Sequence, residues 1–143
     1  FKYEADYYRQ FLISPGVMIT EKTRDWLVAS GLFRTVLPSG SRVVPAYTLE
    51  GNVTALYGDF TSGSAPTAVM EIRFFLVENA PAREKIVCAK TYRATNAVPS
   101  RATDDFIGAL NRDLTEILTR LEADLQEVLS AREPASPAQQ NSQ

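Results

Sequence analysis

The fold of this chain is decided by residues 47–93, which read YTLEGNVTALYGDFTSGSAPTAVMEIRFFLVENAPAREKIVCAKTYR. Three apolar segments follow one another there, separated by polar stretches at residues 59–66 and 79–84. Apolar and polar side chains alternate along the first two segments, which is typical of strands with one buried face. We therefore expect an antiparallel meander of three strands.

The second segment predicts the centre of the core. Its apolar stripe would contribute on the order of 6 to 12 kcal/mol on burial, before entropy is subtracted. The stripe consists of Met70, Ile72, Phe74 and Leu76. The opposite face carries Glu71 and Arg73 but also Val69, Phe75 and Val77, so it is more apolar than a solvated sheet face requires. A covering helix or a second copy of the chain would explain this.

In the first segment, alternation places five side chains on one face: Tyr47, Leu49, Val53, Ala55 and Tyr57. Upstream, aromatic residues at odd-numbered positions alternate with polar ones, which predicts a strand over residues 1–13. Ser14-Pro15 is a helix-start signal and Gly31 a left-handed stop signal, so a helix is expected over Pro15–Ser30. Leu32–Leu37 then reads as a short strand.

A second helix should begin at Thr103, where a hydroxyl and the carboxylates of Asp104 and Asp105 suit the free N–H groups of a first turn. Apolar residues follow at intervals of three and four, which predicts a stripe packed on the sheet. We expect one α/β domain over residues 1–131, an α+β sandwich of a mostly antiparallel sheet with two helices on one face. Residues 132–143 lack apolar periodicity and are expected to be a disordered tail.

Composition restricts the function. The 143 residues include no histidine, which removes the commonest general base and metal ligand. We expect no enzymatic activity, no catalytic residues, no cofactor and no metal. The formal charge of -2, with basic residues scattered singly, argues against nucleic acid and against tight binding to an anionic membrane. Cys88 is the only cysteine and is expected to be a buried thiol.

Surfaces are therefore the candidate sites. Tyr8 and Phe75 are expected on the face of their strands that lies opposite the apolar stripe. Aromatic side chains that point outward from a sheet often mark a contact with protein or lipid. A free sheet edge could also accept a strand from a partner, at Phe1–Tyr8 or Val87–Arg93. The predicted partner-binding residues are Tyr3, Tyr7, Tyr8, Phe75, Tyr92 and Arg93.

Several short pieces, taken in order, carry a resemblance to a known family. They are YEADYYRQFL at residues 3–12, WLVASGLF at 26–33, YTLEG at 47–51, LYGDF at 56–60, KTYR at 90–93 and ALN at 109–111. In this order the chain resembles the ABC-type transport auxiliary lipoproteins over about residues 1 to 130. That family accompanies the mammalian-cell-entry (MCE) systems of Gram-negative bacteria, which move phospholipids between the two membranes.

The resemblance implies a periplasmic domain tethered, usually to the outer membrane, by a lipidated cysteine upstream of Phe1. Cys88 cannot be that anchor, because it lies within a predicted strand. The family fold is similar to the N-terminal domain of the Tol-system propeller protein, and its members are not enzymes. By resemblance, the partners would be an MCE protein with its ABC permease and ATPase.

Two other functions remain open. A lipid-binding carrier would enclose phospholipid in an apolar pocket, expected to be lined by Trp26, Met70, Phe74 and Leu114, whereas a solid core would count against it. A lipopolysaccharide-assembly lipoprotein of the outer membrane could share the fold and the tether but would bind a large barrel. Self-association into a homo-oligomer is also open.

Overall fold

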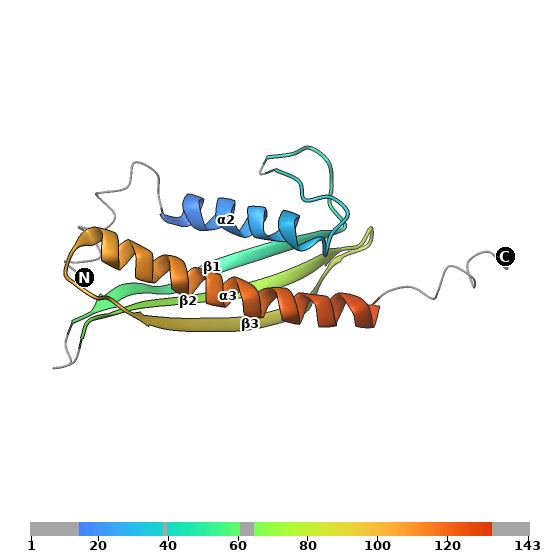
Figure 1. Ribbon diagram of the computed structural model, residues 1–143. Coiled ribbons are helices and arrows are strands. Elements are labelled where there is room, and N and C mark those ends of the chain that lie inside the picture. The colour runs from blue at the N-terminus through green and yellow to red at the C-terminus, as the bar shows by residue number, and fades with distance from the viewer. Residues whose placement is uncertain (1–14, 39, 61–64, 133–143) are drawn as a thin grey trace.

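The structure is a computed structural model that describes residues 15–38, 40–60 and 65–132. Two helices and three strands make up this part of the chain. They are α2 (Pro15–Ser30), β1 (Tyr47–Asp59), β2 (Thr67–Asn79), β3 (Glu84–Ala97) and α3 (Thr103–Arg132). Figure 1 shows both helices lying along the same face of the sheet, with α3 beside α2.

The three strands form one antiparallel sheet in the order β1-β2-β3, which confirms the predicted meander. The fold is therefore α+β, with a sheet that is not closed. The strands are longer than the apolar stripes alone indicate, because polar ends such as Asp59 and Asn79 still pair with neighbours. Central strand β2 is hydrogen-bonded on both sides.

The core lies between the sheet and the helices. On β2 the helix-facing side chains are almost completely buried, with Ile72 and Leu76 each 1% exposed. The stripe on α3 follows the predicted spacing and packs against them. Its most buried members are Ala109, Leu110, Ile117, Leu118, Leu121 and Leu125.

Helix α2 is held much less firmly than α3. Its buried residues are Thr23 and Leu27, whereas Val28 is 61% exposed. Two side-chain hydrogen bonds connect it to α3: the indole N–H of Trp26 donates to Glu122 over 2.8 Å, and the Lys22 ammonium donates to Asn111 over 3.1 Å. Gly31 follows α2 with a φ of 71°, as the sequence predicts for a left-handed stop.

Several expectations need correction. Leu32–Leu37 is not a strand: Leu32, Phe33 and Val36 instead pack against the core from an irregular segment. Arg132, predicted to open the tail, is the last residue of α3 and pairs with Glu78. The strand predicted over residues 1–13 and the tail beyond Arg132 lie outside the described residues.

The alternation predicted for β1 is wrong in its second half. A bulge between Val53 and Ala55 shifts the register, so Leu56 takes the buried position opposite Met70. Ala55 and Tyr57 consequently lie on the opposite face, since one inserted residue reverses the side of every later side chain. Leu56 is 7% exposed, as expected of a core residue.

Candidate functional site

The second face of the sheet carries neither of the described helices. We call it the open sheet face and define it by Tyr57 of β1, Glu71, Arg73 and Phe75 of β2, and Arg93 of β3. The register places them together: Glu71 lies opposite Arg93, and the strand neighbours of Val69 are Tyr57 and Thr95. Charged and aromatic side chains thus share this face with the buried Val69 and Val77, which are 3% and 8% exposed.

Polar contacts run across all three strands on this face. Arg93 forms an ion pair with Glu71 over 3.2 Å and donates to the Tyr57 hydroxyl over 3.0 Å. Thr54, the bulge residue of β1, donates to the other carboxylate oxygen of Glu71 over 2.7 Å. The hydrogen bond from Thr54, followed by that from Arg93, lowers the pKa of Glu71, so this carboxyl stays ionised. The cross-strand bonds hold Arg93 and Tyr57 in fixed positions.

Arg73 and Phe75 lie next to this polar ladder. The Arg73 guanidinium carbon lies 4.9 Å from the centre of the Phe75 ring, within the range of a cation–π contact. Arg73 is exposed and Phe75 is half-buried. An aromatic ring covered by an arginine is a combination common at protein interfaces, where both residue types are enriched.

The structure separates the six predicted partner-binding residues. Phe75 and Arg93 lie together on the open sheet face, while Tyr3, Tyr7 and Tyr8 lie outside the described residues. Tyr92 faces the helices, is 5% exposed and donates to Asp124 over 2.7 Å. Its burial and this hydrogen bond raise the pKa of its hydroxyl. The placement of Tyr92 at a binding surface is therefore wrong, because neighbouring strand residues point to opposite faces.

Sequence reasoning missed Tyr57 as a member of the open sheet face. Simple alternation assigned it to the core, and only the bulge turns it outward. The sequence feature that could have revealed this is Leu56, a large apolar residue at a position of β1 where the alternation predicts a polar one. Such a break in alternation indicates an inserted residue.

The edge of β3 is partly occupied by α3. Arg120 donates to the backbone carbonyl of Arg93 over 2.8 Å, and Arg112 donates to that of Ala97 over 3.2 Å. Carbonyls bonded to arginine are poor acceptors for an added strand. Of the predicted edge at Val87–Arg93, the part before Arg93 is thus the better place for strand addition, although the bulge near Val87 interrupts it.

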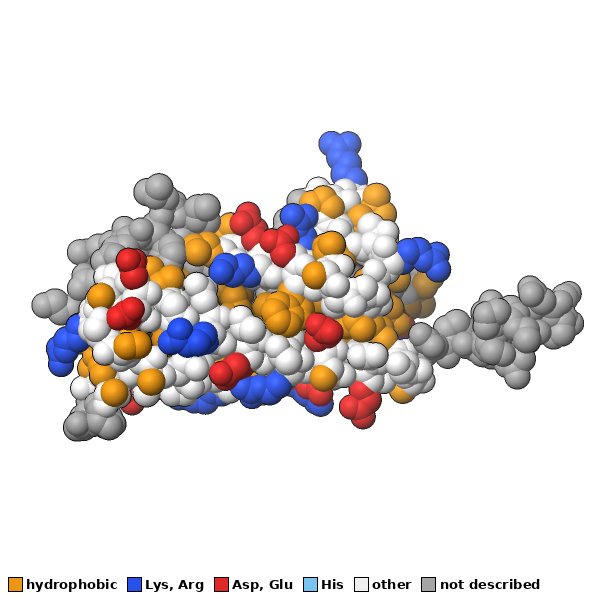
Figure 2. Space-filling model, in the orientation of Figure 1, with side chains coloured by type: hydrophobic (Ala, Val, Ile, Leu, Met, Phe, Trp, Pro, Cys, Tyr) orange, Lys and Arg blue, Asp and Glu red, His pale blue; other side chains and the backbone are white. Residues whose placement is uncertain are grey.

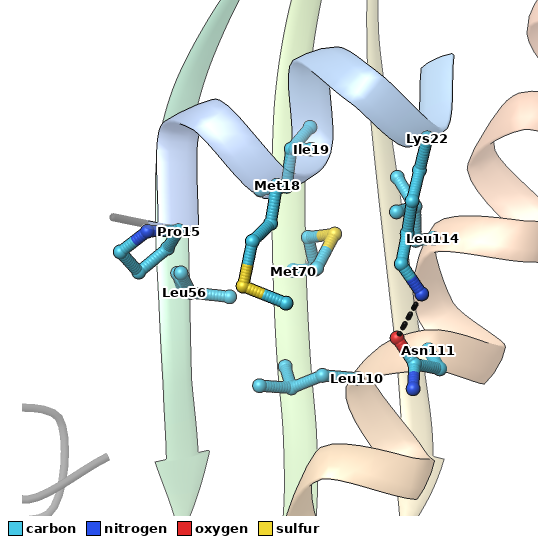
Figure 3. Close-up of a pocket in the computed structure, with 9 residues that line it drawn as sticks. All are labelled: Pro15, Met18, Ile19, Lys22, Leu56, Met70, Leu110, Asn111 and Leu114. Atoms are coloured by element: carbon cyan, nitrogen blue, oxygen red, sulfur yellow. Dashed lines mark hydrogen bonds between the residues drawn. The ribbon is translucent and has the colours of Figure 1, made fainter. Parts of the chain in front are cut away.

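A small, partly open pocket of about 30 Å³ lies beneath α2. Figure 3 shows apolar side chains surrounding it and the hydrogen bond between Lys22 and Asn111 beside it. Its apolar lining is Pro15, Met18, Ile19, Leu56, Met70, Leu110 and Leu114. Ligand sites typically need roughly 300 Å³ or more, so this space suits a water molecule rather than an acyl chain. Trp26 and Phe74, expected in a carrier pocket, do not line it.

Asp113 is the most unusual polar residue of the described core. It is 0% exposed, and its Oδ1 accepts a hydrogen bond from Asn96 over 2.6 Å. Its Oδ2 has no hydrogen-bond partner. Burial, opposed by the bond from Asn96, raises the pKa of Asp113 to about 7. The sequence signal was its spacing, three residues after Leu110 and four before Ile117, which places it on the buried stripe of α3.

Within residues 15–38, 40–60 and 65–132, no cluster of three or more potential ligands could hold a metal ion. In the same ranges, no helix is long and apolar enough to cross a membrane. Cys88 is half-buried, faces the helices beside Leu76 and forms no disulfide.

Comparisons with known proteins place the fold. No protein-family profile matches the chain, and no curated protein matches it significantly in sequence. The crystal structure of a Xanthomonas campestris protein assigned to the family DUF330 is similar, with a TM-score of 0.71 and 20% identity over 85% of this chain and 66% of that one. A hypothetical protein from Chlamydia trachomatis has a TM-score of 0.58 and 10% identity, covering 80% of this chain and 87% of its own.

A weaker likeness, with a TM-score of 0.49 and 17% identity, is to a Caulobacter crescentus protein named a putative lipoprotein; it covers 84% of this chain and 86% of that one. The first two likenesses show that the chain shares a fold with these bacterial proteins. A shared fold does not show a shared function, so the function has to be argued from the residues of the surface.

Proposed function

We propose that this protein is a non-enzymatic periplasmic accessory subunit of an ABC/MCE-type lipid-transport system, docking on the MCE component and linking it to the outer membrane. A lipid anchor upstream of Phe1 would hold it at the membrane. The energy-consuming step would occur in the ATPase of the complex, and the role of this domain would be to position its partner.

The observation that carries the proposal is the open sheet face. It joins three strands through Glu71, Arg93 and Tyr57 and presents Phe75 with Arg73 beside it. Preorganised arginine and aromatic side chains lose little conformational entropy on binding, which favours a protein partner. The ordered resemblance to the auxiliary lipoproteins supports the choice of partner.

The same surface suits no obvious chemistry. Of the residues that define it, Glu71 is the carboxylate, and it is engaged by Thr54 and Arg93 and has a lowered pKa, so it is a poor general base. The lipid carrier is less well supported, because the pocket beneath α2 is about 30 Å³.

The test is mass spectrometry of proteins and lipids that co-purify with the tagged full-length protein after gentle extraction from native envelopes. Recovery of an MCE protein and its ATPase is the expected result. Stoichiometric phospholipid without a protein partner would instead establish the carrier. Recovery of a large outer-membrane barrel would establish the assembly lipoprotein.

A further inference from the structure

The loop between α2 and β1 has an unusual distribution of charge. Its described residues, 31–38 and 40–46, contain Arg34 and Arg42 and no acidic residue. The nearest acidic residues in the sequence are Asp25 and Glu50. A chain with a formal charge of -2 therefore has a locally cationic segment, which the whole-chain charge conceals.

The same loop exposes aliphatic side chains. Val43 is 62% exposed and Val44 is 82% exposed, the largest value among the exposed large hydrophobic residues of the described chain. The loop projects at the upper right of Figure 1, and Figure 2 shows blue and orange side chains there, with red ones beside them toward α2. Basic and apolar groups are thus presented together.

The base of the loop is fixed to the sheet. Asn79, at the end of β2, donates its backbone N–H to the Ala46 carbonyl over 2.9 Å and its side-chain amide to the Pro45 carbonyl over 3.1 Å. The backbone N–H of Val43 is also bonded to the Ser41 hydroxyl over 3.2 Å. The two valines are therefore held next to a firm support.

The adjoining hairpin between β2 and β3 adds to this end of the molecule. It carries Arg83 and Lys85 with one acidic residue, Glu84, between them. Glu78, close by on β2, is already paired with Arg132 of α3. Positive charge consequently exceeds free negative charge near the loop.

We propose that this loop is a contact site for the anionic headgroups of a lipid bilayer. Val43 and Val44 enter the boundary between headgroups and acyl chains, and the guanidinium groups of Arg34 and Arg42 bind phosphate oxygens, for which their planar forks are suited. A projecting tip with aliphatic side chains and no aromatic anchor suits a fluid surface better than a protein pocket. The contact is weak and reversible, and it orients the domain on the membrane.

The inference goes beyond the proposed function and does not depend on it.

The test is flotation of the full chain with vesicles of phosphatidylglycerol and phosphatidylcholine, compared with vesicles of phosphatidylcholine alone. Binding should require phosphatidylglycerol. The double variant R34Q/R42Q should lower partitioning by about 30-fold. V43S/V44S should lower it by about tenfold.

Matched controls change the same residue types elsewhere. V28S/V53S replaces exposed valines of α2 and β1, and R24Q/R101Q replaces arginines outside the loop; both should float like the wild type. Absence of binding to phosphatidylglycerol vesicles, or equal flotation of the loop variants, would overturn the proposal. If the loop variants float normally but lose a protein partner in envelopes, the loop binds an acidic protein surface and the lipid assignment is wrong.

Discussion

The two faces of the sheet differ in what they leave available. On the helix-covered face, side chains such as Ile72 and Leu76 are sealed beneath α3 and serve the stability of the fold. On the open sheet face, Arg73 is exposed and Phe75 half-buried, and the two contact each other, although Val69 and Val77 of the same face are 3% and 8% exposed. One strand, β2, supplies both sets in alternation, so adjacent residues should have different roles.

The largest expected difference is between Ile72 and Phe75. Ile72→Ala should cost about 3 kcal/mol in the free energy of unfolding, because it opens a cavity at a site that is 1% exposed. Phe75→Ala should cost less than about 1 kcal/mol, since the ring is only half-buried. Urea unfolding of both variants measures this, and equal losses would mean that the open sheet face is also core.

The second effect concerns the buried carboxyl beneath β3. The pKa of Asp113 is near 7 in the folded state, above the ordinary value for an aspartate, so its contribution to stability is complete below that ordinary value and is lost progressively as the pH rises from there to about 7. Asp113→Asn is neutral at every pH, so it should be more stable than the wild type at pH 8 by on the order of 2 kcal/mol.

Urea unfolding from pH 5 to pH 8 tests this. The wild type should weaken over that range and the variant should change less. Glu116, which also accepts a hydrogen bond from Asn96, is present in both proteins. An unchanged slope in Asp113→Asn would show that another group carries the pH dependence.

A tyrosine on each face provides a smaller comparison. Tyr92→Phe removes the hydrogen bond to Asp124 within the core and should cost about 1 kcal/mol. Tyr57→Phe removes the bond from Arg93 on the open sheet face and should cost less, because water replaces the partner. Thermal unfolding of the two variants gives the comparison, and the reverse order would contradict the assignment of faces.

The smallest effect on stability is expected from the ion pair of the open sheet face. Glu71→Gln with Arg93→Gln should leave the unfolding transition unchanged within error, since exposed ion pairs contribute little. The same double variant should lower recovery of the protein partner from envelopes. A large loss of stability would mean that the pair is structural.

Much of the fold could be predicted from alternation and helix signals. The three strands, the start of α3 at Thr103 and the stop of α2 at Gly31 required only local patterns. Alternation of apolar and polar residues did not predict the position of the bulge at Thr54. The irregular path of Leu32–Leu37 depends on packing against the core. Local propensity does not contain such tertiary preferences.

The candidate site was predicted less completely. Phe75 and Arg93 were assigned to this surface from their positions in the strands. Tyr92, the neighbour of Arg93, points to the opposite face and was assigned to the wrong one. Tyr57 was assigned to the core because the bulge in β1 was not predicted. The sequence places Asp113 on the buried stripe of α3, but it does not show that its Oδ2 lacks a hydrogen-bond partner, because this depends on how the sheet packs against the helix.

Binding through the open sheet face is measured most directly by comparing partner recovery for three full-length proteins extracted from native envelopes: the wild type, R73S/F75S and V28S. R73S/F75S should lose at least about nine-tenths of the proposed MCE partner, as expected for interface anchors, while its unfolding transition stays close to that of the wild type. V28S, which removes an exposed valine of α2, should retain it. Full recovery with R73S/F75S would contradict the claim that the open sheet face binds the partner.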